Sequence, residues 1–298
     1  MRTKLLCFSS LLITAAAGPP SSITLSGDNI IPVTINGEAV RIKVDPAYAG
    51  AVTVNPDIVS RAKLKRSMLG FRHRVGPVTI SFWSDSAKAD YGLGIEKRRI
   101  FWPDRSIITG SDGLAGPNAL PWSRLTFTIG PKAEGEQEID LPLETTGTSG
   151  LSGTITKLQL GDAEVKVWFS LILPQSLATA GLGAELARSN GGAMTGVAHL
   201  APIRFGIERP VRTMRLSAPL LIGGRPLTEM GVRTADFGDA SGIPEAGAVT
   251  DPDEIVVTAA KKGRPDYSLL VGRDFLSGCS SLTYDFPAKL IRLSCLSR

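Results

Sequence analysis

The sequence predicts an all-β protein built from two similar halves, with a few short helices. Short runs rich in β-branched residues recur along its 298 residues and are separated by clusters of Gly, Pro, Asn and Asp, a pattern typical of strands joined by turns. Residues 35–45 also correspond without a gap to residues 160–170, an offset of 125 positions. Residues 112–120 likewise have a counterpart at 269–276. The two matching segments come in the same order in each half, which indicates an internal duplication.

The strongest strand signals are short and β-branched, and turn residues bound each of them. They lie at residues 30–35, 40–44, 78–82, 124–129, 165–169 and 290–293.

Two longer helices are expected at residues 56–64 and 177–188. Asn55 precedes the first of them as a capping residue, and a proline takes the first helical position. A further short helix is expected after each of two glycines, Gly116 and Gly272.

The first 17 residues have the three regions of a secretory signal peptide. Arg2 and Lys4 supply positive charge, residues 5–13 are apolar, and three alanines follow at 15–17. The alternative is a frayed terminus or a first strand, but the Gly and Pro residues that come next continue a strand poorly. We therefore expect an exported protein, either secreted or periplasmic in a Gram-negative bacterium. No later run approaches the roughly 18 apolar residues of a membrane helix, so no membrane span is expected.

The charged residues suggest no nucleic-acid partner, because the formal charge of +5 is small for a chain of this length. Basic residues gather at 63–74 and 97–99, where a solvated surface is the simplest interpretation and a site for an anionic partner is the alternative. His73 and His199 lack a nearby Cys or Glu at ligand spacing. The sequence therefore predicts no metal site and no cofactor.

Cys279 and Cys295 are the cysteines that remain after removal of the signal segment. They lie on the two strands of the last hairpin, and a turn centred between residues 287 and 288 puts Cys279 nearly opposite residue 295 or 296. Opposed residues of antiparallel strands have Cα atoms about 4.5–5.5 Å apart, which is within disulfide range. A disulfide is expected in an oxidising compartment.

The repeated segments resemble the pepsin and retropepsin family of aspartic proteases. Residues 33–45 are similar to the opening strands of a family lobe, and Leu-Val-Gly-Arg-Asp-Phe-Leu at 270–276 is similar to its closing motif. The resemblance covers most of residues 24–298 and implies a two-lobed fold with a cleft between the lobes. Its implied boundaries are 24–140 for the N-terminal lobe and 141–298 for the C-terminal lobe, with an inserted loop at 238–266.

The family's active site holds two aspartates that share one proton, so that one activates water while the other protonates the substrate carbonyl oxygen. Thr and Gly follow each aspartate in the family. Here Pro46 and Ala47 follow Asp45, and Ser170 stands at the equivalent position of the second half. The resemblance implies a catalytically impaired protein that binds an extended polypeptide or a partner protein in the cleft. Two alternatives for Asp45 stay open: catalysis in an active endopeptidase, and a strand-end carboxylate that accepts backbone hydrogen bonds.

The inserted loop contains a segment that resembles the TonB box of outer-membrane receptors. The resemblance implies an extended strip that pairs with an edge strand of TonB, which would make the chain a TonB-system interaction protein. The alternative is an added strand in the sheet of the second half. The segment consists of Asp253, Glu254, Ile255, Val256, Val257, Thr258 and Ala259.

Overall fold

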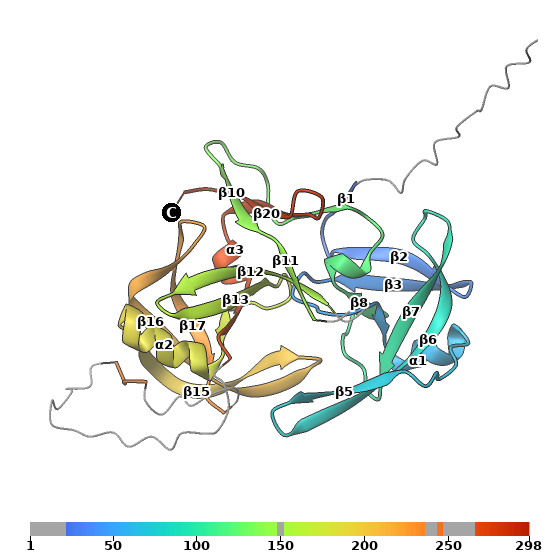
Figure 1. Ribbon diagram of the computed structural model, residues 1–298, viewed down its shortest axis with the longest axis horizontal. Helices are drawn as coiled ribbons and strands as arrows, with labels where there is room; N and C mark the ends of the chain where they lie inside the picture. Colours follow the sequence, from blue (N-terminus) through green and yellow to red (C-terminus); the bar gives the residue numbers. More distant parts are fainter. Residues whose placement is uncertain (1–21, 148–151, 236–242, 247–265, 298) are drawn as a thin grey trace, which may run out of the picture.

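The computed structural model shows a protein built mainly from strands (Figure 1). Strands account for 55% and helices for 10% of the described residues, so the prediction of an all-β protein is confirmed. Among the described residues, no helix is long and apolar enough to cross a membrane. The predicted signal peptide at 1–17 and the TonB-box-like segment lie outside the described residues. The structure describes residues 22–147, 152–235, 243–246 and 266–297.

The first half of the chain forms a seven-stranded sheet in the order β2-β3-β8-β4-β7-β6-β5. Along β2 every second side chain is buried, as expected for a strand with one face on the core. Asn36 and Gly37 connect β2 to β3 with φ values of 52° and 88°, which is the conformation of a two-residue hairpin turn. The strands are β2 (Ile30–Ile35), β3 (Glu38–Val44), β4 (Thr53–Val54), β5 (Gly70–Val75), β6 (Val78–Asp90), β7 (Ile95–Pro103) and β8 (Gly113–Ala115).

The second half forms an eight-stranded sheet in the order β11-β12-β13-β18-β14-β17-β16-β15. Apart from β11, this order repeats that of the first sheet strand for strand, so the repeated order of elements that the sequence predicts is present. The strands are β11 (Glu144–Thr146), β12 (Gly153–Leu160), β13 (Ala163–Phe169), β14 (Leu177–Ala178), β15 (Ala193–Arg204), β16 (Ile207–Ile222), β17 (Arg225–Arg233) and β18 (Ser268–Val271).

The two sheets differ most in the connection before their parallel strands β8 and β18. Nine residues, 104–112, join β7 to β8, whereas 34 residues, 234–267, join β17 to β18. The predicted inserted loop, 238–266, falls within this second interval. Most of that loop lies outside the described residues.

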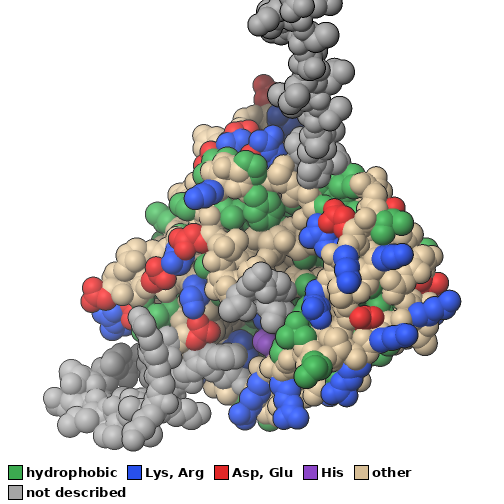
Figure 2. Space-filling view, turned by 45° about the vertical axis from the view of Figure 1, so that its right-hand side comes forward, with side chains coloured by type: hydrophobic (Ala, Val, Ile, Leu, Met, Phe, Trp, Pro, Cys, Tyr) green, Lys and Arg blue, Asp and Glu red, His purple; other side chains and the backbone are tan. Residues whose placement is uncertain are grey.

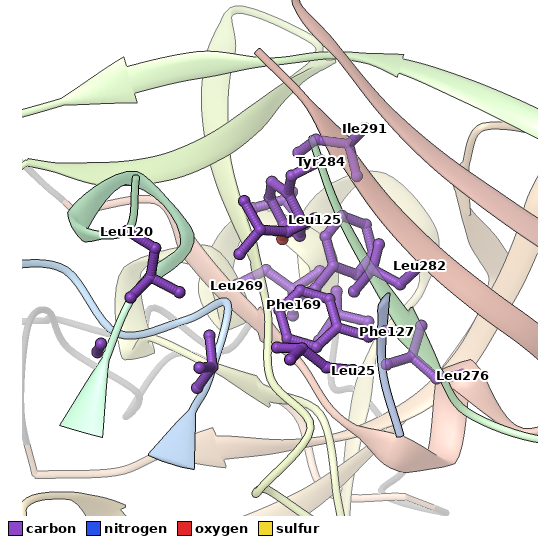
Figure 3. Close-up of a cluster of buried hydrophobic side chains, with 14 of the residues drawn as sticks. Leu25, Leu120, Leu125, Phe127, Phe169, Leu269, Leu276, Leu282, Tyr284 and Ile291 are labelled. Carbon is purple, nitrogen blue, oxygen red and sulfur yellow. The ribbon is translucent and has the colours of Figure 1, made fainter. Parts of the chain in front are cut away.

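A third, five-stranded sheet takes strands from both halves in the order β1-β9-β19-β20-β10 and runs along the upper edge of the molecule in the view of Figure 1. Beneath it, buried side chains from this sheet meet Phe169 and Leu269 of the second half in one hydrophobic cluster (Figure 3). That cluster also contains the buried residues of β2 and β3, so the three sheets share a core. The strands are β1 (Ser22–Leu25), β9 (Arg124–Thr128), β10 (Gln137–Pro142), β19 (Cys279–Asp285) and β20 (Leu290–Cys295).

Both longer helices are shorter than the sequence predicts. Helix α1 (Pro56–Arg61) ends earlier, and Lys63 just beyond it has a φ of 51°. Helix α2 (Ala180–Asn190) begins later because Leu177–Ala178 forms β14, after which the Thr179 side chain caps the helix by accepting the Leu182 N–H. The predicted short helices after the two glycines are present as the 3₁₀-helix η1 (Pro117–Ala119) and α3 (Arg273–Leu276).

Cys279 and Cys295 form a disulfide between β19 and β20, which confirms the predicted pair. The sequence allowed either residue 295 or residue 296 to lie opposite Cys279. A register shift between Cys279 and Ser281 decides for Cys295, because a bulge adds one residue to β19.

Removing this disulfide is expected to lower the free energy of unfolding by about 3 kcal/mol, because the bond closes a loop of sequence separation 16 in the unfolded chain. Urea unfolding of the wild type and of a Cys279→Ala/Cys295→Ala variant measures the loss. Reduced wild-type protein is the control that keeps both buried side chains in place. A loss below about 1 kcal/mol in both samples would contradict the prediction.

Candidate functional site

Asp45 and Ser170 meet where the two repeats end their second strands. Strand β3 runs parallel to β8, and the Asp45 N–H donates to the Ala115 carbonyl oxygen at 3.0 Å. In the second half β13 runs parallel to β18, and the Ser170 N–H donates to the Val271 carbonyl oxygen at 2.8 Å. The same backbone arrangement therefore presents both side chains, from positions 125 residues apart, to one point between the sheets.

The Asp45 carboxylate is buried and accepts hydrogen bonds only from the second half, as far as the described residues show. The Ser170 hydroxyl lies 3.2 Å from Oδ1 and 3.1 Å from Oδ2, and the Leu171 N–H donates to Oδ1 at 2.8 Å. None of these partners is a carboxyl group. Ser170 therefore stands beside Asp45, and the Leu171 N–H gives Asp45 one of the backbone hydrogen bonds expected of a strand-end carboxylate.

Burial raises the pKa of Asp45 from 3.8 to about 6, because a carboxylate loses its hydration inside the protein. The hydrogen bonds from Leu171 and Ser170 and the positive charge of Arg204 oppose this shift without cancelling it. Asp45 is therefore mainly ionised at pH 7 and mainly protonated at pH 5.

The Ser170 hydroxyl has a structural role besides its contact with Asp45. Its oxygen accepts the N–H groups of Ile172 and Leu173, both at 3.2 Å, and so closes the turn that follows β13. With its oxygen held by two backbone donors and its proton directed to Asp45, the hydroxyl cannot replace a second titrating acid.

A cavity of about 550 Å³ opens above this pair. Its lining comes from both halves of the chain and is mainly apolar, with Ile107 and Leu114 on one side and Ile172, Leu173 and Leu177 on the other. The volume lies within the range of about 300–1,000 Å³ that is usual for ligand sites.

Two hairpins border the cavity, one from each sheet: β5–β6 and β15–β16. Their tips approach each other in Figure 1, and a side chain on Gly76 would meet the Arg209 guanidinium at 2.4 Å. Phe205 at the tip of β15–β16 packs into the first half, with its ring centroid 5.3 Å from those of both His73 and Phe82 and 6.1 Å from that of Tyr48. The second hairpin thus covers the cavity and contacts the first half.

Two arginines of the second half, Arg204 and Arg233, line the cavity with Asp45. Burial lowers the pKa of Arg204, while the nearby Tyr48 and Asp45 partly oppose that effect. His73 also lines the cavity, and burial together with the charge of Arg204 lowers its pKa to about 4, so this imidazole is neutral at pH 7. Tyr48 donates to the Thr53 hydroxyl at 2.6 Å, and burial raises its pKa to about 12.

The structure brings together only some of the residues that the sequence singles out. Asp45 and Ser170 are adjacent, whereas Cys279 and Cys295 lie in the five-stranded sheet and do not line the cavity. Within the described ranges, no group of three or more His, Cys, Asp and Glu side chains is arranged to hold a metal ion. The TonB-box-like residues Asp253, Glu254, Ile255, Val256, Val257 and Thr258 lie outside the described residues, so their role stays a prediction.

Sequence reasoning missed Arg204, Tyr48 and Phe205. The Arg-Phe-Gly triplet at 204–206, between two strand-like runs, carried a signal for a hairpin tip. Nothing in the sequence connected that tip to Asp45. The sequence matches no known family model and no curated protein.

Proposed function

We propose that this chain is an exported, two-lobed protein similar to aspartic proteases, which lacks proteolytic activity and binds an extended polypeptide in the cavity beside Asp45. The observation that carries the proposal is the contact between Asp45 and Ser170. Two repeated strand ends meet as the resemblance requires, and one of them supplies a hydroxyl where a second carboxyl group is needed.

A lone carboxyl group supports the loss of peptide hydrolysis. The reaction needs one carboxylate to take a proton from water while a neighbouring acid gives a proton to the carbonyl oxygen. Asp45 titrates near pH 6 but has no carboxyl neighbour among its hydrogen-bond partners in the described chain. Pro46 further removes a backbone donor from the loop that carries Asp45.

The cavity favours a polypeptide over a small polar metabolite. Its lining is mainly apolar, and polar side chains such as Asp45, Tyr48 and Arg204 are interspersed in it. Apolar walls bind side chains, and a few placed polar groups bind the peptide backbone. Both hairpins are long enough to flank a chain that enters between the two halves.

The purified protein is expected to bind an unfolded, carboxymethylated polypeptide without cleaving it between about pH 3 and pH 6, where a shared-proton dyad works. Binding is measured by fluorescence anisotropy and integrity by mass spectrometry. Ile172→Trp should weaken binding at least about fivefold, because the larger side chain fills part of the cavity.

Ile95→Trp is the matched control. Ile172 and Ile95 are 40% and 71% exposed, so both variants should fold, and Ile95 does not line the cavity. Cleavage that disappears in Asp45→Asn would overturn the proposal in favour of an active endopeptidase. Equal binding by both Trp variants would show that the polypeptide binds elsewhere.

A further inference from the structure

Arg204 occupies an unusual turn at the tip of the β15–β16 hairpin. Strand β15 ends at Arg204, and the two residues before β16 have positive φ values, 55° for Phe205 and 68° for Gly206. A left-handed conformation is unfavourable for a bulky residue such as Phe. Packing of the Phe205 ring against Tyr48, His73 and Phe82 offsets this cost and fixes the tip over the cavity.

The Arg204 guanidinium has open bonding capacity. In the described part of the chain its carbon Cζ lies 5.4 Å from the centroid of the Phe205 ring, and its charge interacts with Asp45 and Tyr48, but none of the described residues accepts a hydrogen bond from it. A guanidinium carries five N–H donors in a planar fork. Leaving such donors unsatisfied in an apolar, partly enclosed position is unfavourable.

The charges around the cavity favour an anion at this position. Among the described residues that line the cavity, Arg74, Arg204 and Arg233 are cationic, and Asp45 and Asp266 are acidic. The two acids are already engaged, Asp45 by Ser170 and Leu171 and Asp266 by the Ser268 hydroxyl at 2.7 Å. Planar carboxylates match the guanidinium fork with two parallel hydrogen bonds. The apolar walls favour a carboxylate attached to an apolar body over a strongly hydrated inorganic anion.

We propose that Arg204 binds the C-terminal carboxylate of an apolar peptide whose last side chains occupy the cavity. This inference rests on the proposed function, which it narrows from any extended polypeptide to a free C-terminal end.

A dependence on pH follows from the position of Asp45. The carboxylate of a peptide C-terminus, with a pKa of about 3.5, stays ionised above pH 5. Asp45 loses its charge as the pH falls through about 6, which removes a like charge from the same cavity. Over this range His73 stays neutral and Tyr48 stays protonated, while the three arginines keep their charge. Peptide acids should therefore bind about tenfold more tightly at pH 5 than at pH 8.

The test uses N-acetylated tetrapeptides of Leu, Val and Phe, each made as a free acid and as a C-terminal amide, titrated calorimetrically into the full chain at pH 5 and pH 8. We expect the acids to bind at least about tenfold more tightly than the amides. Arg204→Gln should abolish this preference, and Arg72→Gln, on the exposed face of the other hairpin, should retain it. Asp45→Asn should remove the pH dependence of binding. Asp28→Asn, which alters an exposed carboxylate that does not line the cavity, should leave the pH dependence unchanged.

The two proposals fail in different ways. Acids and amides that bind equally well, or a preference that survives in Arg204→Gln, would overturn the role of Arg204 and leave polypeptide binding in place. A complete lack of binding by acids and amides would overturn the proposed function as well. Thermal unfolding of each variant checks that it is folded.

Discussion

Asp45→Asn is expected to stabilise the folded protein at pH 7.5 by on the order of 3 kcal/mol relative to the wild type. Burial raises the pKa of this carboxyl group from 3.8 to about 6, so its ionised form is less stable in the folded protein than in the unfolded chain. Asparagine removes the charge and keeps an oxygen that accepts the Leu171 N–H. The gain corresponds to the difference between the two pKa values at about 1.4 kcal/mol per unit.

The sign of the pH dependence follows from proton binding. Between about pH 4 and pH 6 the folded protein holds a proton on Asp45 that the unfolded chain has released. Unfolding therefore releases a proton in this range, and the free energy of unfolding falls as the pH rises. The stabilising contribution of protonated Asp45 is complete below about pH 4 and is lost as the pH rises through about 6.

Urea unfolding at half-unit intervals from pH 4 to pH 8 measures this contribution. The difference between Asp45→Asn and the wild type should be near zero at pH 4 and reach its maximum above pH 7. Asp28→Asn, which alters an exposed carboxylate in the turn after β1, is the control and should leave the profile unchanged. If Asp45→Asn were less stable than the wild type at pH 7.5, the hydrogen bonds of the carboxylate would outweigh the cost of its burial.

Much of the fold was accessible from the sequence because it depends on local patterns. Alternating burial marks strands such as β2, and Asn36-Gly37 specifies a tight hairpin turn. The repeat then extends these local signals to the whole chain, because two copies of one pattern form two sheets of the same strand order. The contact between Asp45 and Ser170 follows from that repeat and from parallel pairing at both strand ends.

The rest of the site depends on where the hairpin tips lie, and no local pattern determines that. Phe205 adopts a positive φ that Phe rarely favours, and its packing against the first half compensates for it. Residue propensities and hydrophobic periodicity carry no information about such a balance between local strain and distant contacts. For the same reason the sequence did not predict that Arg204 lines the cavity, since its position depends on the turn that Phe205 makes.

Two glycines at equivalent points of the repeat lie where the surrounding atoms leave no room for a side chain. Gly116 and Gly272 have φ values of −89° and −95°, which any residue adopts, so backbone freedom does not explain them. A Cβ atom on Gly116 would lie 2.0 Å from the Tyr48 carbonyl oxygen, and one on Gly272 would lie 2.6 Å from the Gln175 carbonyl carbon. Each glycine lets the loop that follows Asp45 or Ser170 pack directly on the neighbouring strand end.

Gly116→Ala and Gly272→Ala are each expected to lower the free energy of unfolding by about 3 kcal/mol, because the added methyl group meets backbone atoms that cannot rotate away. Gly110→Ala is the control: it has a φ of 79° but open space around its Cβ position, so it isolates the cost of the left-handed conformation, about 1 kcal/mol. Urea unfolding midpoints compare the three variants. Gly116→Ala should also weaken peptide binding, since Tyr48 and Asp45 lie on the displaced loop. Losses no larger than that of Gly110→Ala would mean that the loops move aside readily, and the cavity floor would then be less rigid than these contacts imply.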